Sequence, residues 1–210
     1  MKSAAIGVTV HSGWGAVVAI AGGRGTEEVL LRRRVDIIDS KIAGSIQPYH
    51  YVAKKEISAA EKHLARCASV SGRLAFESLT RISAELRDHG FLLQSAAILL
   101  SSARPLPDLK EILASHALIH TAEGEFFRQA FRSAFEKLRI HVTGIRARDL
   151  DDCAFKAFGK TAPAIRKRID GMGRSLGPPW TKDEKTAGMA AAIVLAGIPS
   201  KSHAAHSSGT

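Results

Sequence analysis

The sequence predicts an α/β protein with one mixed five-stranded sheet and helices on both of its faces. Residues 4–39 form three short strand-like segments joined by glycine-containing turns at Ser12-Gly13 and Arg24-Gly25, as in an antiparallel β-meander. The almost uninterrupted apolar run at 91–102 is typical of a strand buried on both faces. Segments with helical periodicity precede and follow this run. The expected order βββαβαβα therefore places helices over both faces of the sheet.

The meander is predicted from two local signals. Strands at 4–11 and 14–21 flank Ser12-Gly13, a dipeptide typical of a tight hairpin turn. A third strand at 27–39 is rich in β-branched residues, and Arg32 and Arg34 share one of its faces. We expect that face to be solvated.

The remaining chain is predicted to be mainly helical. A connection at 40–53 leads to a helix at 54–88, in which Ser71-Gly72 marks a candidate bend. After the buried strand we expect, in order, a helix at 108–138, a strand at 140–147 and helices at 149–158, 162–173 and 181–197. Thr181 and Glu184 form a T-x-x-E capping box at the start of the last helix. Residues 1–198 are expected to form one domain, and 199–210 a disordered tail.

Composition narrows the class of protein and its partners. The 210 residues carry a formal net charge of +10, which favours an anionic small molecule or nucleic acid as partner, although the charges are scattered. Cys67 and Cys153 lie far apart and form no C-x-x-C pair, which indicates a reducing compartment. Thr9 and His11 interrupt the apolar N-terminal run, so a strand explains it better than a secretory leader. No membrane span is expected, and we predict a cytoplasmic protein.

The predicted topology resembles the ribonuclease H-like superfold, in particular its Holliday-junction resolvase and actin-like branches, over about residues 4–197. The closing stretch PPWTKDEKTAGMAAAIVLAG is similar to the last helix of the resolvases, where an acidic start precedes a run of small residues. The motifs HSGW, QPYH, RPLP…ILASHALIHTAEGEFFR and LGPPW together resemble a group of uncharacterised bacterial proteins, a likeness that implies no activity.

The resemblance implies phosphodiester hydrolysis by two Mg²⁺ ions held on carboxylates at the strand ends. This sequence departs from that pattern. The first strand ends in GVTVHSG without an Asp, and the buried strand ends in serines without a Glu. Asp183 and Glu184 match the acidic pattern, but helix capping explains them as well, and Asp183 stays a candidate ligand-binding residue. We therefore expect the standard two-metal nuclease carboxylates to be absent.

The stretch ASHALIHTAEGEFFR carries the most informative candidate site. On a helix, His116, His120 and Glu123 fall within about 60° of one another. They lie on the apolar stripe that should face the core, and burying three titratable groups is costly unless they are paired or bind something. Two interpretations remain open. The trio could ligate a divalent metal such as Zn²⁺, with Glu123 as third ligand or base, or it could brace the helix through hydrogen bonds.

Other candidates each have a functional and a structural interpretation. His11 is a candidate third histidine ligand or general base, with Ser12 beside it, or else a turn histidine. Arg104 suits a phosphate or carboxylate, or a salt bridge. Tyr49 and His50 are candidates for a lid over the same pocket, or pack on the sheet edge.

Three functions follow from these candidates. We favour a ribonuclease H-like domain whose atypical His/Glu/Arg pocket, at the carboxyl ends of the strands, binds a phosphate-bearing or other anionic ligand. The second is a metal-dependent phosphoester hydrolase that uses His116, His120 and Glu123. The third is a structural or assembly protein, a homodimer through the helix at 54–88, which would then expose an apolar stripe.

Overall fold

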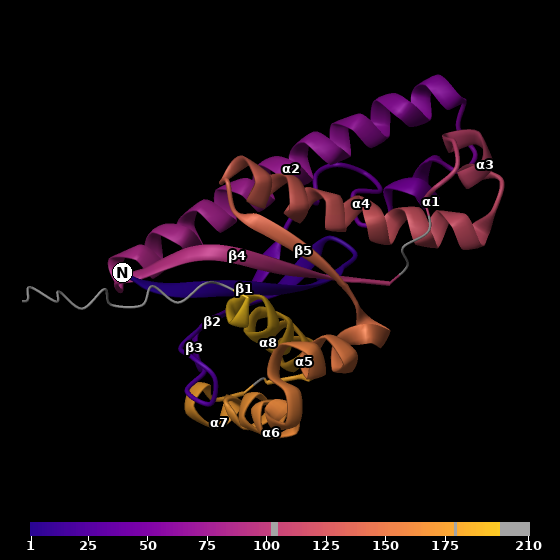
Figure 1. The fold of residues 1–210 in the computed structure, drawn as a ribbon. Coiled ribbons are helices and arrows are strands. Elements are labelled where there is room, and N and C mark those ends of the chain that lie inside the picture. The colour runs from indigo at the N-terminus through magenta and orange to yellow at the C-terminus, as the bar shows by residue number, and fades with distance from the viewer. Residues whose placement is uncertain (102–104, 179, 198–210) are drawn as a thin grey trace, which may run out of the picture.

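The sheet has five strands in the order β3-β2-β1-β4-β5 (Figure 1). The structure is a computed structural model, and it describes residues 1–101, 105–178 and 180–197. The first three strands form an antiparallel meander, and the last two run parallel to β1. The strands are β1 (Lys2–His11), β2 (Trp14–Ala21), β3 (Glu28–Asp36), β4 (Phe91–Leu100) and β5 (His141–Arg146). The predicted mixed sheet is therefore confirmed.

The meander matches the prediction except at Arg32. The hairpin between β1 and β2 turns at Ser12-Gly13, where Gly13 has φ +82°, a backbone conformation that favours glycine. Arg32 was expected on a solvated face, but it is half-buried and donates hydrogen bonds to the carbonyl oxygens of Gly177 at 2.9 Å and Pro178 at 3.0 Å. That prediction is wrong because the segment before the last helix folds back over this face of β3.

The predicted connection at 40–53 contains a short helix, α1 (Pro48–Val52). Proline at the first helical position suits a helix start, because its fixed φ is helical and its missing N–H has no partner there. The next helix, α2 (Ile57–Asp88), continues through Ser71 and Gly72 without the predicted bend. A single glycine costs a helix about 1 kcal/mol, and burial of apolar side chains of α2 such as Leu79 and Ile82 outweighs that cost.

The predicted single helix at 108–138 is two helices, α3 (Leu109–Leu113) and α4 (His116–Lys137). Ser115 interrupts them with an extended backbone, and its hydroxyl accepts the backbone N–H of Leu118, as a helix N-cap does. The C-terminal helices are α5 (Leu150–Phe158), α6 (Ala162–Gly171), α7 (Gly173–Leu176) and α8 (Lys182–Ala196). The helix expected at 162–173 is thus divided, whereas the Thr181–Glu184 capping box is confirmed.

Helices cover both faces of the sheet (Figure 1). Along β1, Ile6 and Val8 pack into the core that includes the phenylalanines of α4, whereas Ala5 packs into the core beneath α8. The apolar stripe of α2, including Leu79 and Ile82, is buried against the sheet and α4. That stripe is therefore not the exposed surface that assembly through α2 would need.

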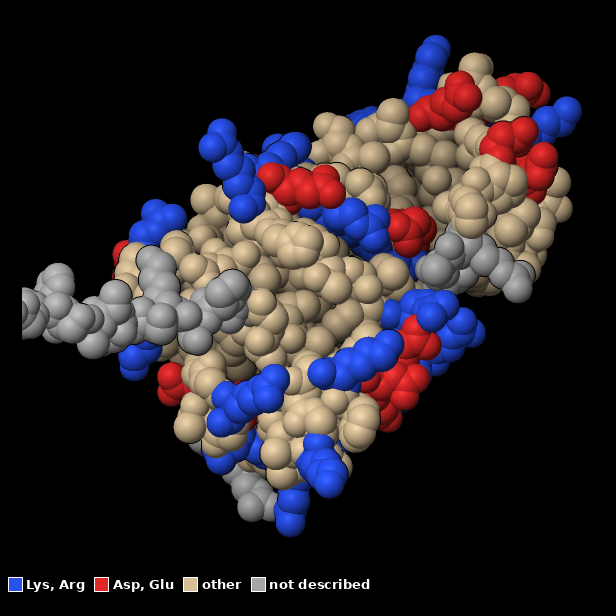
Figure 2. Space-filling view, in the orientation of Figure 1, with Lys and Arg blue, Asp and Glu red and all other residues tan. Residues whose placement is uncertain are grey.

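The surface and the chain ends add three facts. Lys and Arg side chains are dispersed over the face drawn in Figure 2, with acidic side chains among them, as the sequence predicts. Within the described residues, no helix is long and apolar enough to span a membrane. Arg104 and the predicted tail at 199–210 lie outside the described residues.

Candidate metal centre

Three histidines from two helices converge at one end of the molecule. His116 and His120 lie one turn apart at the start of α4, and His50 reaches them from α1. Each offers a ring nitrogen, and these three nitrogens all lie within 4.8 Å of one another. The ring centroids are 4.4 Å apart for His116 and His120, and 4.7 Å apart for His50 and His120.

The spacing of the nitrogens suits one metal ion. Zn–N bonds of about 2.0–2.1 Å in a tetrahedral site place two ligand nitrogens roughly 3.4 Å apart. The Nε2 atoms of His50 and His116 are separated by 3.4 Å. The nitrogen offered by His120 lies within 4.8 Å of both.

Glu123 holds His50 from behind. Its Oε2 lies 2.8 Å from Nδ1 of His50, and its Oε1 accepts the backbone N–H of His50 at 3.2 Å. A carboxylate accepts hydrogen bonds but cannot donate them, so Nδ1 carries the proton and Nε2 faces the other two histidines. Histidine ligands of metals are commonly oriented in this way by a carboxylate. Glu123 is only 4 % exposed, so little water competes for its oxygens.

The three groups predicted to share a buried stripe differ in exposure. Glu123 is buried, but His116 and His120 are exposed, so that part of the prediction is wrong. The physical reason is visible in Figure 1, where the first turns of α4 extend with α1 and α3 past the ends of the strands. The stripe covers the sheet only from about Phe127 onward. The centre is therefore open to solvent on one side.

The group of residues that could hold a metal differs in membership from the predicted trio. Glu123 was expected to join His116 and His120 as third ligand, but both of its oxygens face His50. His50, expected in a lid, occupies the third position instead. Pro48 at the start of QPYH was the signal that could have predicted a short helix there.

Tyr49 precedes His50 in α1 and contacts a different part of α4. Its ring meets Phe126 of α4 edge to face, with centroids 6.2 Å apart. Burial raises the pKa of the Tyr49 phenol above its ordinary value, and the negative charge of Glu123 raises it further. Tyr49 therefore lies at the end of a groove between α2 and α4.

His11 does not join this centre. It follows Thr9 on the face of β1 that meets α8, whereas α4 lies on the opposite face (Figure 1). Its Nε2 lies 3.0 Å from Oδ2 of Asp183, and its ring stacks on Trp14 at 4.3 Å. The guanidinium of Arg34 lies over Trp14, 3.8 Å from the ring centre. Trp14 is half-buried between these groups.

The carboxyl ends of β1 and β4 carry few acids in the part of the chain that the structure describes. β1 ends at His11, followed by the exposed Ser12, and Ser101 follows β4. Burial alone would raise the pKa of Glu184, but hydrogen bonds from the hydroxyl and backbone N–H of Thr181 outweigh it and hold the pKa below its ordinary value. Glu184 thus caps α8, and Asp183 pairs with His11.

Comparisons with known proteins find similar solved structures only at low sequence identity. Solved structures similar to this chain include RuvC of Thermus thermophilus in complex with Holliday junction substrate, at 10% identity over 91% of each chain with a TM-score of 0.49. A second Thermus thermophilus RuvC structure shows 11% identity over 90% of this chain and 91% of that one, with a TM-score of 0.48. A Ppx/GppA family member from Aquifex aeolicus shows 9% identity over 77% of this chain and 40% of that one, with a TM-score of 0.36. No family model matches the sequence. No curated protein matches it either.

Proposed function

We propose that this protein is a metal-dependent hydrolase of phosphate-bearing substrates, with His50, His116 and His120 as the metal ligands. One observation carries the proposal: three imidazole nitrogens converge within 4.8 Å, and a buried carboxylate orients one of them. Histidines that bind a metal almost always donate their other ring N–H to a carboxylate, a carbonyl or water, as His50 does to Glu123.

Three histidines leave a fourth position of a tetrahedral ion free for water or substrate. A divalent ion held by these three histidines would act as a Lewis acid and would activate water for attack on a phosphoester. The exposed rings of His116 and His120 leave that position open to solvent. The net charge of +10 favours an anionic substrate, either a small molecule or nucleic acid.

Imidazole ligands also narrow the choice of metal. Nitrogen donors suit Zn²⁺, Fe²⁺ and other transition ions, whereas Mg²⁺ prefers oxygen. We therefore propose a one-metal centre in α1 and α4, rather than the two-Mg²⁺ arrangement at the strand ends that the resemblance implies.

The first test is metal content by elemental analysis of tag-free protein. We expect about one Zn²⁺, Mn²⁺ or Fe per chain in the wild type, and its loss in His50→Ala and in the double variant His116→Ala/His120→Ala. His141→Ala is the matched control, because this exposed histidine lies at the start of β5. Full metal content in the double variant would overturn the assigned ligands.

The second test is hydrolysis of chromogenic phosphate monoesters and diesters by the metal-loaded protein. Activity should disappear with a chelator and in His50→Ala, and should return to the wild type alone on addition of Zn²⁺. A metal-loaded wild type that hydrolyses neither ester would leave a metal site without the proposed activity.

A metal-free network is the alternative that the geometry also accommodates. The 3.4 Å separation of the His50 and His116 Nε2 atoms permits one N–H···N hydrogen bond. If the wild type binds no metal and His116→Ala merely lowers the free energy of unfolding, the cluster braces α1 against α4 instead.

A further inference from the structure

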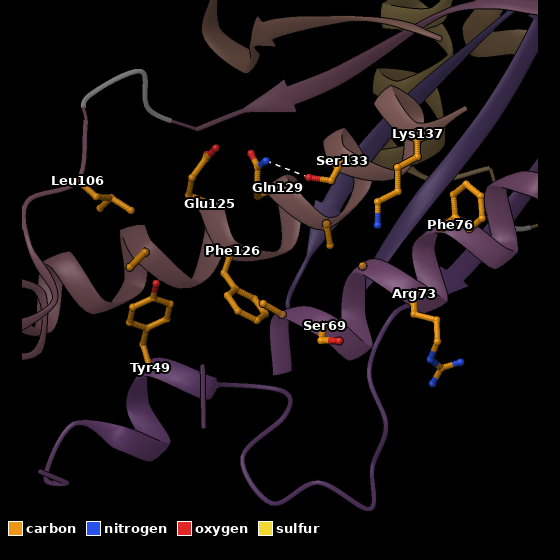
Figure 3. Close-up of a pocket in the computed structure, with 14 residues that line it drawn as sticks. Tyr49, Ser69, Arg73, Phe76, Leu106, Glu125, Phe126, Gln129, Ser133 and Lys137 are labelled. Carbon is orange, nitrogen blue, oxygen red and sulfur yellow. Dashed lines mark hydrogen bonds between the residues drawn. The ribbon is translucent and has the colours of Figure 1, made fainter. Parts of the chain in front are cut away.

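A groove of about 670 Å³ runs along the surface between α2 and α4 (Figure 3). Ligand pockets commonly have volumes of about 300–1,000 Å³. Phe76 and Phe126 are among the apolar side chains that line it, and Tyr49 and Leu106 lie at one end. The groove is thus large enough for a small molecule and offers it apolar contacts.

One stretch of the α2 side of the groove is formed by small residues. Ala68, Ser69 and Gly72 line it, and a Cβ placed on Gly72 would meet no atom within 4 Å. Alanine would stabilise an uninterrupted helix by about 1 kcal/mol relative to glycine. Gly72 is not at a bend or in the left-handed region, so no backbone requirement explains it. Its effect is to keep the groove wide at its middle.

The charges in the groove favour an anion. Lys137 and Arg73 lie toward the end opposite Tyr49 (Figure 3). The one acid that lines the groove within the described chain, Glu125, is paired with Arg128 at 3.0 Å and with Arg132 at 3.1 Å. Its charge is therefore offset, and Lys137 and Arg73 give the far end a positive potential, although Arg73 also contacts Glu77.

We propose that this groove binds a single-chain amphiphile, an alkyl or acyl chain that ends in a phosphate or carboxylate. The chain lies along Phe126 and Phe76, and the anionic group meets Lys137. The lining residues from Ala122 to Lys137 extend about 22 Å along α4 at 1.5 Å per residue. This length suits an extended chain better than a compact anion. The binding rests on the groove and not on the metal centre.

The test is a calorimetric titration with dodecyl phosphate below its micelle concentration. We expect saturable 1:1 binding to the wild type, and affinities lower by about tenfold or more for dodecanol, which lacks the charge, and for butyl phosphate, which lacks the chain. Equal affinity for dodecanol would overturn the role of the cationic end. Equal affinity for butyl phosphate would overturn the role of the apolar floor.

Variants locate the site. Gly72→Leu should fill the groove, and Lys137→Glu should reverse its charged end, each weakening dodecyl phosphate binding about tenfold or more. Lys62→Glu, an exposed position near the start of α2 and outside the groove lining, is the matched control for Lys137→Glu. Circular dichroism establishes folding, and Lys137→Glu alone decides the matter if Gly72→Leu fails to fold. Unchanged binding in Lys137→Glu would overturn the proposal.

Two further measurements distinguish the groove from the metal centre and from a dimer interface. In chelator-treated, metal-free buffer, the double variant His116→Ala/His120→Ala should bind dodecyl phosphate as the metal-free wild type does, so failure of the metal centre would not affect the result. A dimer in solution that Gly72→Leu converts to a monomer would assign the groove to a second copy of the chain. That outcome would overturn the amphiphile as its occupant.

Discussion

Replacement of Glu123 by Gln tests whether the buried carboxylate orients a metal ligand. The carboxylate accepts two hydrogen bonds from His50, at 2.8 Å from Nδ1 and at 3.2 Å from the backbone N–H. The amide of Gln has one accepting oxygen and one donating NH₂ group, so it can replace only one of these acceptors. If the NH₂ group faces Nδ1, the proton of His50 moves to Nε2 and blocks the atom that should bind the metal.

The expected loss follows from this geometry. Removal of a hydrogen-bonded group behind a metal ligand lowers metal affinity by about 10–100-fold, which corresponds to about 1.4–2.8 kcal/mol. The assay is a competition titration of Zn²⁺ against a chromophoric chelator at constant pH. Glu136→Gln is the control, since Glu136 lies on the same helix but is exposed. If Glu123→Gln keeps the affinity of this control while remaining folded, the orienting role of Glu123 is refuted.

Three other predictions concern stability and titration. Gly7→Ala would place a Cβ 1.8 Å from the backbone oxygen of Ala187. We therefore expect thermal melting to show a free energy of unfolding lower by about 3 kcal/mol or more. Gly72→Ala, by contrast, should not lower the free energy of unfolding. Thr181→Ala removes the capping box of α8 and should lower the free energy of unfolding, measured in urea, by about 1 kcal/mol. An unchanged urea concentration at the unfolding midpoint would contradict this. The raised pKa of Tyr49 stabilises the fold below the ordinary tyrosine pKa, and this contribution is lost as pH rises through the raised value. An ultraviolet titration of the two tyrosines should therefore lose its later step in Tyr49→Phe.

The sheet was predictable because its signals are local. The turn signals between the strand-like segments of residues 4–39 and the apolar run at 91–102 lie within the segments that they predict. The wrong predictions concern helices whose existence or ends depend on tertiary contacts. A five-residue helix such as α1 is not stable alone, and its packing on α2 and α4 supports it. The sequence does not indicate where α3 ends, because the helical pattern continues on both sides of Ser115.

The candidate site was predictable in part. Spacing along one helix identifies His116 and His120, but their partner His50 lies 66 residues earlier than His116, and no periodicity links the two segments. His11 was grouped with them because it ends a strand. Alternate residues of a strand share one face, so His11 lies on the same face of β1 as Ala5 and Thr9, the face that meets α8.

Two adjacent residues of the short helix α1 belong to two different candidate sites. Tyr49 lies at the end of the groove, and His50 belongs to the histidine cluster. A helix of five residues moves as one unit, so a ligand that restrains Tyr49 also restrains His50. Linkage then requires reciprocity: whatever factor the metal applies to amphiphile affinity, the amphiphile applies to metal affinity. A thermodynamic cycle of titrations, each ligand with and without the other, would measure this coupling free energy directly.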